Sequence, residues 1–156
     1  MRDAAVPDDP RTRPAPDHAR PSDATDAEVA AVGRLSEALE TVERARGHLY
    51  DFHQLIGHAD HQLGEAVNAL RAAGHADLAA DIGADLLGRN VLPGRWTFQV
   101  VEEFDDGYWA AFRRWDAAAR EGVLGGRRHV YEAEMKEARR THGRPGHEAR
   151  PTEPEE

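Results

Sequence analysis

The feature that most constrains this chain is a ladder of apolar residues, spaced three and four apart, that keeps one phase from Val29 to Ala73. That spacing is typical of one face of an α-helix. No proline or turn cluster interrupts the ladder, and the four residues Thr25–Glu28 before it match a capping box,. We therefore expect one long helix over residues 25–73. A helical hairpin that reverses at Gly47 is the alternative, because helices this long are unusual in globular proteins.

Further helices are expected after Gly74, a residue type that ends helices because it adopts the left-handed conformation at little cost. The apolar spacing predicts a short helix over 76–87, a turn at Pro93-Gly94, a helix over 95–120 and a last helix over 127–140. The fold class is thus all-α, a small helical bundle built on one long N-terminal helix.

The helix over 95–120 carries most of the aromatic residues of the chain. Seven of the ten lie between Asn90 and Trp115, and aromatic side chains dominate packing energetics. A stripe within about a third of the helical circumference is predicted to face the core, namely Val101, Phe104, Tyr108, Ala111, Phe112 and Trp115. Trp109 lies off this stripe, so it either packs on a second side near Tyr131 or is exposed as a binding residue.

Proline marks the borders of the folded region. Eight of the nine prolines lie before residue 26 or after Thr141, in polar segments that cannot bury enough apolar surface to fold. The sequence predicts disordered tails at 1–25 and 142–156 around a single helical domain at 26–141.

Composition excludes several classes of function. The chain has no cysteine, which removes disulfides, thiolate catalysis and cysteine-ligated zinc. A net charge of −9 disfavours binding to a nucleic-acid backbone. No apolar run approaches the roughly 20 residues of a membrane helix, and the N-terminus lacks the apolar stretch of a secretory signal. We expect a cytoplasmic protein without membrane contact.

The N-terminal half of the long helix has few apolar partners left within the chain. Its seam would remain exposed in a monomer, and pairing the same seam from two chains, as a coiled coil or bundle, would cover it. Our first hypothesis is a non-enzymatic interaction protein that needs no cofactor and forms a homodimer, with a protein partner as a further option. The candidate interface residues are Val29, Val32, Leu35, Leu39, Val42 and Trp109.

A second hypothesis is a divalent-metal or small-ligand site, which would allow an enzymatic function. Four histidines lie between His48 and His61, but at about 100° per residue they cannot all reach one ion. Bundle metal sites use inward carboxylates and Glu-x-x-His pairs on facing helices, and the folded region has no such pair. The candidate ligands, which would have to meet between two helices, are His53, His58, Asp60, Glu102, Asp105 and Asp106.

Two other charged segments of the chain are candidates for catalysis or binding. The carboxylates of Glu102–Asp106 could raise one another's pKa, but neighbouring helical positions point in different directions, and no nucleophile elbow or phosphate loop is present. No catalytic residue is assigned. The basic residues within Arg127–Arg144 give a third hypothesis, contact with nucleic acid, which the interleaved glutamates and the acidic total disfavour.

Overall fold

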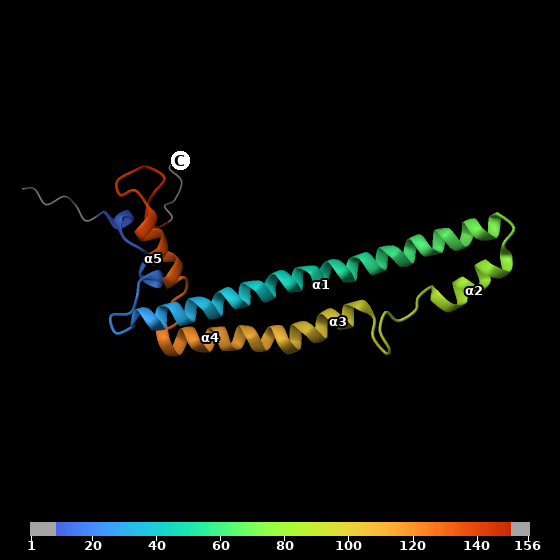
Figure 1. The fold of residues 1–156 in the computed structure, drawn as a ribbon, viewed down its shortest axis with the longest axis horizontal. Helices are drawn as coiled ribbons and strands as arrows, with labels where there is room; N and C mark the ends of the chain where they lie inside the picture. Colours follow the sequence, from blue (N-terminus) through green and yellow to red (C-terminus); the bar gives the residue numbers. More distant parts are fainter. Residues whose placement is uncertain (1–8, 151–156) are drawn as a thin grey trace, which may run out of the picture. The chain divides into compact units, whose positions relative to one another are not determined.

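The structure is a computed structural model that describes residues 9–150, and these form helices and no strand. Helices α1 (Asp26–Ala72), α2 (Ala76–Leu86), α3 (Thr97–Phe104), α4 (Ala110–Leu124) and α5 (Val130–Arg139) follow one another along the chain (Figure 1). A π-helical turn, η3 (Asp105–Trp109), joins α3 to α4, and two 3-10 turns, η1 (Pro10–Thr12) and η2 (Pro16–His18), precede α1. The predicted all-α class is confirmed.

The described chain divides into two units. Unit 1 consists of residues 9–38 and 114–150, and unit 2 of residues 39–113. The boundary therefore falls inside α1 and inside α4, and the domain predicted over 26–141 contains parts of both units. Each unit is described separately below.

Helix α1 begins with the predicted capping box. The Thr25 amide donates to Glu28 Oε2 at 2.8 Å, and the Glu28 amide donates to Thr25 Oγ1 at 3.3 Å. The hydrogen bonds from Thr25, first its backbone amide and then its hydroxyl, lower the pKa of Glu28. The helix runs unbroken for 47 residues, so the single long helix is confirmed and the alternative reversal at Gly47 is wrong. The chain turns only at Gly74, whose φ is 92°.

Unit 1 has a small apolar core, in which Val29 and Val32 pack with Leu124 and Val130. The two α1 valines are only 1% and 6% exposed. The expectation that the seam is bare in a monomer is therefore wrong at these two positions, because the end of α4 and the start of α5 cover it. Leu35, the next seam residue, is half-buried.

A buried carboxylate joins α1 to α4 beside this core. Asp116 is 4% exposed and accepts a hydrogen bond from Ser36 Oγ at 2.7 Å and one from Arg120 Nε at 3.0 Å. Because buried charges are tolerated only when they are paired, the Arg120 side chain of the same helix compensates the carboxylate, and the hydrogen bond from Ser36 links α1 to α4 within unit 1.

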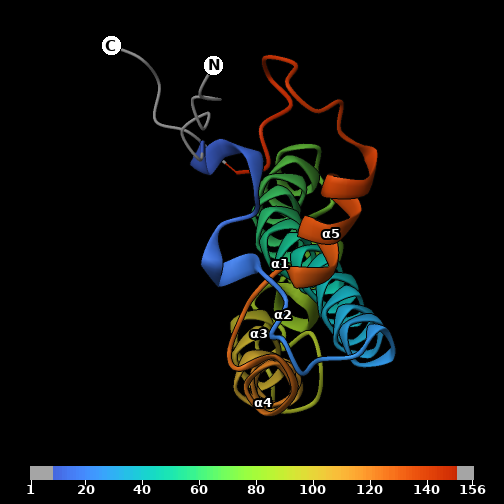
Figure 2. The same ribbon diagram turned by 90° about the vertical axis from the view of Figure 1, so that its left-hand side faces the viewer.

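Residues before α1 also belong to unit 1. Arg20 makes a two-bond pair with Glu134 of α5, at 2.6 and 2.8 Å, and a further ion pair with Asp26. Figure 2 shows residues 9–25, in blue, alongside α5 and the loop that follows it. Residues 9–25 and 142–150 thus have contacts in the structure, residues 1–8 and 151–156 lie outside its described part, and the disorder predicted for both tails stays a prediction.

Unit 2 is a hairpin of two antiparallel arms. α1 forms one arm, and α2 followed by α3 runs back beside it (Figure 1). Four positions of α1, spaced seven residues apart, contact the second arm along one line. Val67 lies 3.6 Å from where a Cβ on Gly83 would be, and Asp60 Oδ1 accepts from the Gly88 amide at 2.9 Å.

The other two contacts lie farther toward the N-terminus of α1. His53 Nδ1 lies 2.7 Å from Thr97 Oγ1, and Arg46 holds Asp105 through two hydrogen bonds of 2.7 Å. Residues 46, 53, 60 and 67 are seven apart, so they form one line along the helix, which we call the contact line.

The close approach of α1 and α5 within unit 1 leads to a stability prediction. A Cβ on Gly33 would lie 3.0 Å from Tyr131 Cγ, whereas one on Gly57 would have no atom within 4 Å. We expect Gly57→Ala to stabilise the protein by about 1 kcal/mol, the usual gain for a helix-interior glycine. Gly33→Ala should raise the free energy of unfolding by less, or lower it, because the Tyr131 side chain must move to make room for the new methyl group. Urea unfolding followed by circular dichroism measures both, and equal gains would contradict the packing described.

Candidate interaction surface

The contact line of unit 2 is mostly polar. Arg46, His53 and Asp60 all use their side chains to hold the second arm, and only Val67 is apolar. The two-bond pair from Arg46 holds the pKa of Asp105 below its usual value, and the carboxylate in turn raises the pKa of Arg46. Such paired, directional contacts fix the alignment of the two arms.

Trp109 packs beside this pair. Its ring lies 4.5 Å from the Arg46 guanidinium carbon and 4.7 Å from that of Arg113, both within cation–π range,. The indole Nε1 is buried and has no hydrogen-bond partner. Trp109 therefore packs toward α1 of its own chain. The sequence predicts either packing near Tyr131 of the last helix or exposure to solvent, and the structure shows neither.

The π-helical turn explains why the predicted aromatic stripe is only partly correct. A π-turn closes with i→i+5 hydrogen bonds, as from the Ala110 amide to the Asp105 carbonyl. It takes up one more residue than an α-turn, so the phase of the stripe changes at this point. Val101, before the turn, is buried as predicted, but Tyr108 and Trp115 are 59% and 64% exposed.

The candidate metal ligands do not come together. His53 pairs with Thr97, Asp60 with the Gly88 amide and Asp105 with Arg46. The other candidates are exposed, namely His58, Glu102 and Asp106. Within residues 9–150 no group of three or more histidine, aspartate or glutamate side chains is placed to hold a metal ion. His53 and Asp60 both lie on the contact line of α1, so the structure uses their side chains to hold the second arm.

The apolar ladder of α1 lies to one side of the contact line. At about 100° per residue, Phe52 and Ala59 are turned about 100° from His53 and Asp60, and Leu55 about 160° from His53. Their exposure follows from this offset: Phe52 is 39% and Leu55 64% exposed, and Ala59 is exposed as well. The hairpin is thus closed along one line of α1, and the apolar stripe that borders this line is only partly covered: Leu49, Ile56, Leu63 and Leu70 are half-buried.

The second arm has an apolar residue of α2 turned to the same side. Leu86 precedes Leu87, which lies beside Gly64 of α1. In an antiparallel helix pair, the residue before a contact residue points to the same side on both helices. Leu86 is 47% exposed. Trp96, the extended N-cap residue of α3, is 59% exposed, and its ring packs edge-on against that of Phe98 at a centroid distance of 5.4 Å. Leu78, which shares the predicted face of α2 with Leu86, is 52% exposed.

A groove runs between the two arms on this side. It has a volume of about 430 Å³, and its apolar lining consists of Ile56, Ala59, Leu63, Leu86 and Val91. Since α1 and the second arm both contribute, their apolar strips share one surface. We call this surface the open face; it consists of Phe52, Leu55, Ala59, Leu63, Leu78 and Leu86.

Unit 2 buries very little of its apolar content. Across residues 39–113, all of which are described, only Val67, Ala79 and Val101 are buried apolar residues. Ten large apolar side chains in the same range are at least 37% exposed: Tyr50, Phe52, Leu55, Leu78, Leu86, Leu87, Leu92, Trp96, Phe98 and Tyr108. Scattered exposed apolar residues are normal, but a contiguous strip marks an interaction surface.

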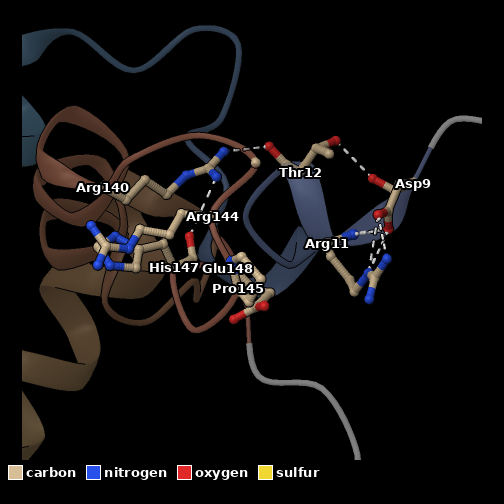
Figure 3. A pocket seen from close by; sticks show the side chains of 9 residues that line it. Asp9, Arg11, Thr12, Arg140, Arg144, Pro145, His147 and Glu148 are labelled. Carbon is tan, nitrogen blue, oxygen red and sulfur yellow. Dashed lines mark hydrogen bonds and ion pairs between the residues drawn. The ribbon is translucent and has the colours of Figure 1, made fainter.

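The basic residues of unit 1 are partly occupied by internal contacts. The Arg140 side chain is 5% exposed, pairs with Glu137 and donates to the carbonyls of Thr12 and His147 (Figure 3). Arg127 donates to the Ala19 carbonyl. The hydrogen bonds from Arg140 also lower the pKa of Glu137. These arginines hold the segments around α5 together, which leaves fewer of them to contact phosphates.

Comparison with known proteins found no family model, no curated protein and no solved structure that matches this chain. No helix within residues 9–150 combines the length and the apolar character needed to cross a membrane. The proposed function is therefore based on the open face of unit 2.

The pair that aligns the arms can be tested by pH. We expect Asp105→Asn to destabilise the protein near neutral pH, because Arg46 loses its charged partner. The folded-state pKa of Asp105 is lowered, so its contribution is full above the ordinary carboxyl pKa and disappears as pH falls through the lower folded-state value. Asp106→Asn, an exposed neighbour, is the control and should have little effect. Urea unfolding at neutral and acidic pH measures this. An equal loss of unfolding free energy in both variants would contradict a stabilising Arg46–Asp105 pair. A loss in Asp105→Asn that does not become smaller at acidic pH would also contradict it.

Proposed function

We propose that this protein acts by self-association, in which the open face of unit 2 is covered by the same face of a second copy. One observation supports this most directly: across residues 39–113, three apolar side chains are buried and ten large ones are exposed. A domain that folds alone usually buries most of its large apolar side chains. The proposed interface differs from the predicted seam, because Val29 and Val32 are covered within unit 1.

A second copy suits this surface for a geometric reason. Two antiparallel arms form one layer, and stable helical architectures pack two layers around a core. Two hairpins facing each other supply the second layer and form a four-helix arrangement. Because both copies present the same patch, the contact closes as a symmetric dimer instead of growing into a fibre.

The open face is large enough to matter energetically. Its large exposed members, Phe52, Leu55, Leu78 and Leu86, are 39–64% exposed. Full burial of such a side chain is worth about 1.5–3 kcal/mol, so completing half of it adds roughly 1 kcal/mol each, or on the order of 10 kcal/mol over two copies. Association entropy offsets part of this gain. We therefore expect a dissociation constant in the micromolar range.

Mutation of the open face tests the proposal. At tens of micromolar, we expect the full chain to have a dimer mass by size-exclusion chromatography with light scattering. Leu55→Asp should weaken association by about 30-fold or more, since a carboxylate buried without a partner costs at least about 2 kcal/mol. Gln54→Asp adds the same charge at an exposed position on the other side of α1 and should leave the mass unchanged. A monomer mass for the wild-type chain, or equal behaviour of the two variants, would refute it.

Salt provides a second readout from the same samples. Unit 2 has twelve carboxylates and six arginines, a net charge of −6, so two copies repel each other and added salt should strengthen dimerisation by screening. Binding of a basic partner to the same face would instead weaken with salt. Dimerisation that weakens as salt rises would contradict a like-charged pair.

A further inference from the structure

We propose that the two copies pack with α1 antiparallel to the partner's α1, crossing at Ala59. This inference rests on the proposed self-association and adds the symmetry of the contact. It follows from the order of residue sizes along the open face and from the alignment of the two arms within unit 2.

The apolar positions of α1 on the open side are arranged symmetrically about Ala59, although Ile56 and Leu70, which lie nearer the contact line, have no apolar counterpart. Leu55 and Leu63 lie four positions to either side of it, Phe52 and Ala66 seven, and Ala45 and Ala73 fourteen. In an antiparallel pair, a residue at a given distance before the crossing point meets the residue at the same distance after it. Phe52 would then meet the partner's Ala66, and Leu55 the partner's Leu63. Large residues facing small ones interdigitate well, and alanine at the crossing lets the helices approach closely.

The second arm fits the same symmetry. Leu87, next to Leu86, lies against Gly64, and Thr97 lies against His53. Leu86 and Thr97 are therefore level with positions of α1 about five residues, or about 7.5 Å, on either side of Ala59. The two-fold rotation that pairs the α1 helices also stacks the two second arms, and it brings Leu86 level with the start of the partner's α3. Leu86 is 47% exposed, so the same rotation covers the open face on both arms.

A parallel pairing explains less of the surface. It would place Phe52 on the partner's Phe52 and Ala66 on the partner's Ala66, which crowds one turn and leaves a gap at another. A two-fold axis parallel to α1 would also place the two second arms on opposite sides of the α1 pair, which leaves Leu86 uncovered. Charge does not separate the two arrangements, because Asp51 and Glu65 beside the face are acidic in either one.

Cross-linking of single-cysteine variants tests the arrangement, since the natural chain has no cysteine. Ala59→Cys lies at the proposed crossing and should form a disulfide-linked dimer on mild oxidation. Ala45→Cys and Ala73→Cys lie fourteen residues, about 21 Å, from the crossing. Neither variant alone should form a disulfide-linked dimer, because the two equivalent cysteines of the dimer would be about 42 Å apart. A mixture of the two variants should link.

The outcomes separate this inference from the proposed function. Ala59→Ser is the matched control and should keep the helical circular dichroism and the dimer mass. If the variants and the wild-type chain are monomers, self-association itself fails. If they are dimers in which Ala45→Cys and Ala73→Cys each link to themselves, the copies are parallel and only the antiparallel arrangement is overturned. Dimers in which Ala59→Cys does not link would overturn it as well.

Discussion

The structure of unit 2 depends on an offset between two stripes of the same helix. The contact line of α1, from Arg46 to Val67, holds the second arm through side chains that are mainly polar. The apolar ladder lies beside that line, turned by about 60–160°. Because the second arm covers α1 along the polar line, the part of the apolar ladder nearer that line is half-buried, and the part farther from it, including Phe52 and Ala59, stays at the surface.

Unit 1 shows the opposite use of the same helix. There the apolar residues of α1 face inward, with Val29 and Val32 packed against Leu124 and Val130. The buried carboxylate of Asp116 is fully engaged by Ser36 and Arg120. Unit 1 thus closes a core of its own, small as it is, whereas unit 2 does not, and this difference locates the proposed interaction surface in residues 39–113.

Much of the fold could be predicted from local patterns. The capping box at Thr25–Glu28, the unbroken phase to Ala73 and the stop at Gly74 are short-range signals, and the structure agrees with each. The π-turn at Asp105–Trp109 could not be predicted, because it changes a helix by one residue without a proline or a composition signal. That single turn exposes Tyr108 and turns Trp109 inward.

The surface was predicted less well than the helices, because it depends on long-range pairing. Periodicity identified the ladder with Phe52, Ala59 and Leu63, but not which of two neighbouring lines on α1 the second arm would cover. It also could not show that the beginning of α5 would reach back to cover Val29. The sequence predicts self-association through apolar surface that the chain leaves uncovered. The structure has such a surface, but it lies in unit 2 and not at Val29 and Val32.

The most direct test of the central claim is the dependence of thermal stability on protein concentration. If the open face is covered only by a second copy, unfolding is coupled to dissociation, and the melting temperature of the full chain must rise as the concentration increases from about 1 to 100 μM. This result would show that the native state contains more than one chain. A melting temperature that stays constant over this range would mean that the hairpin is stable with its apolar face exposed, and it would contradict the account.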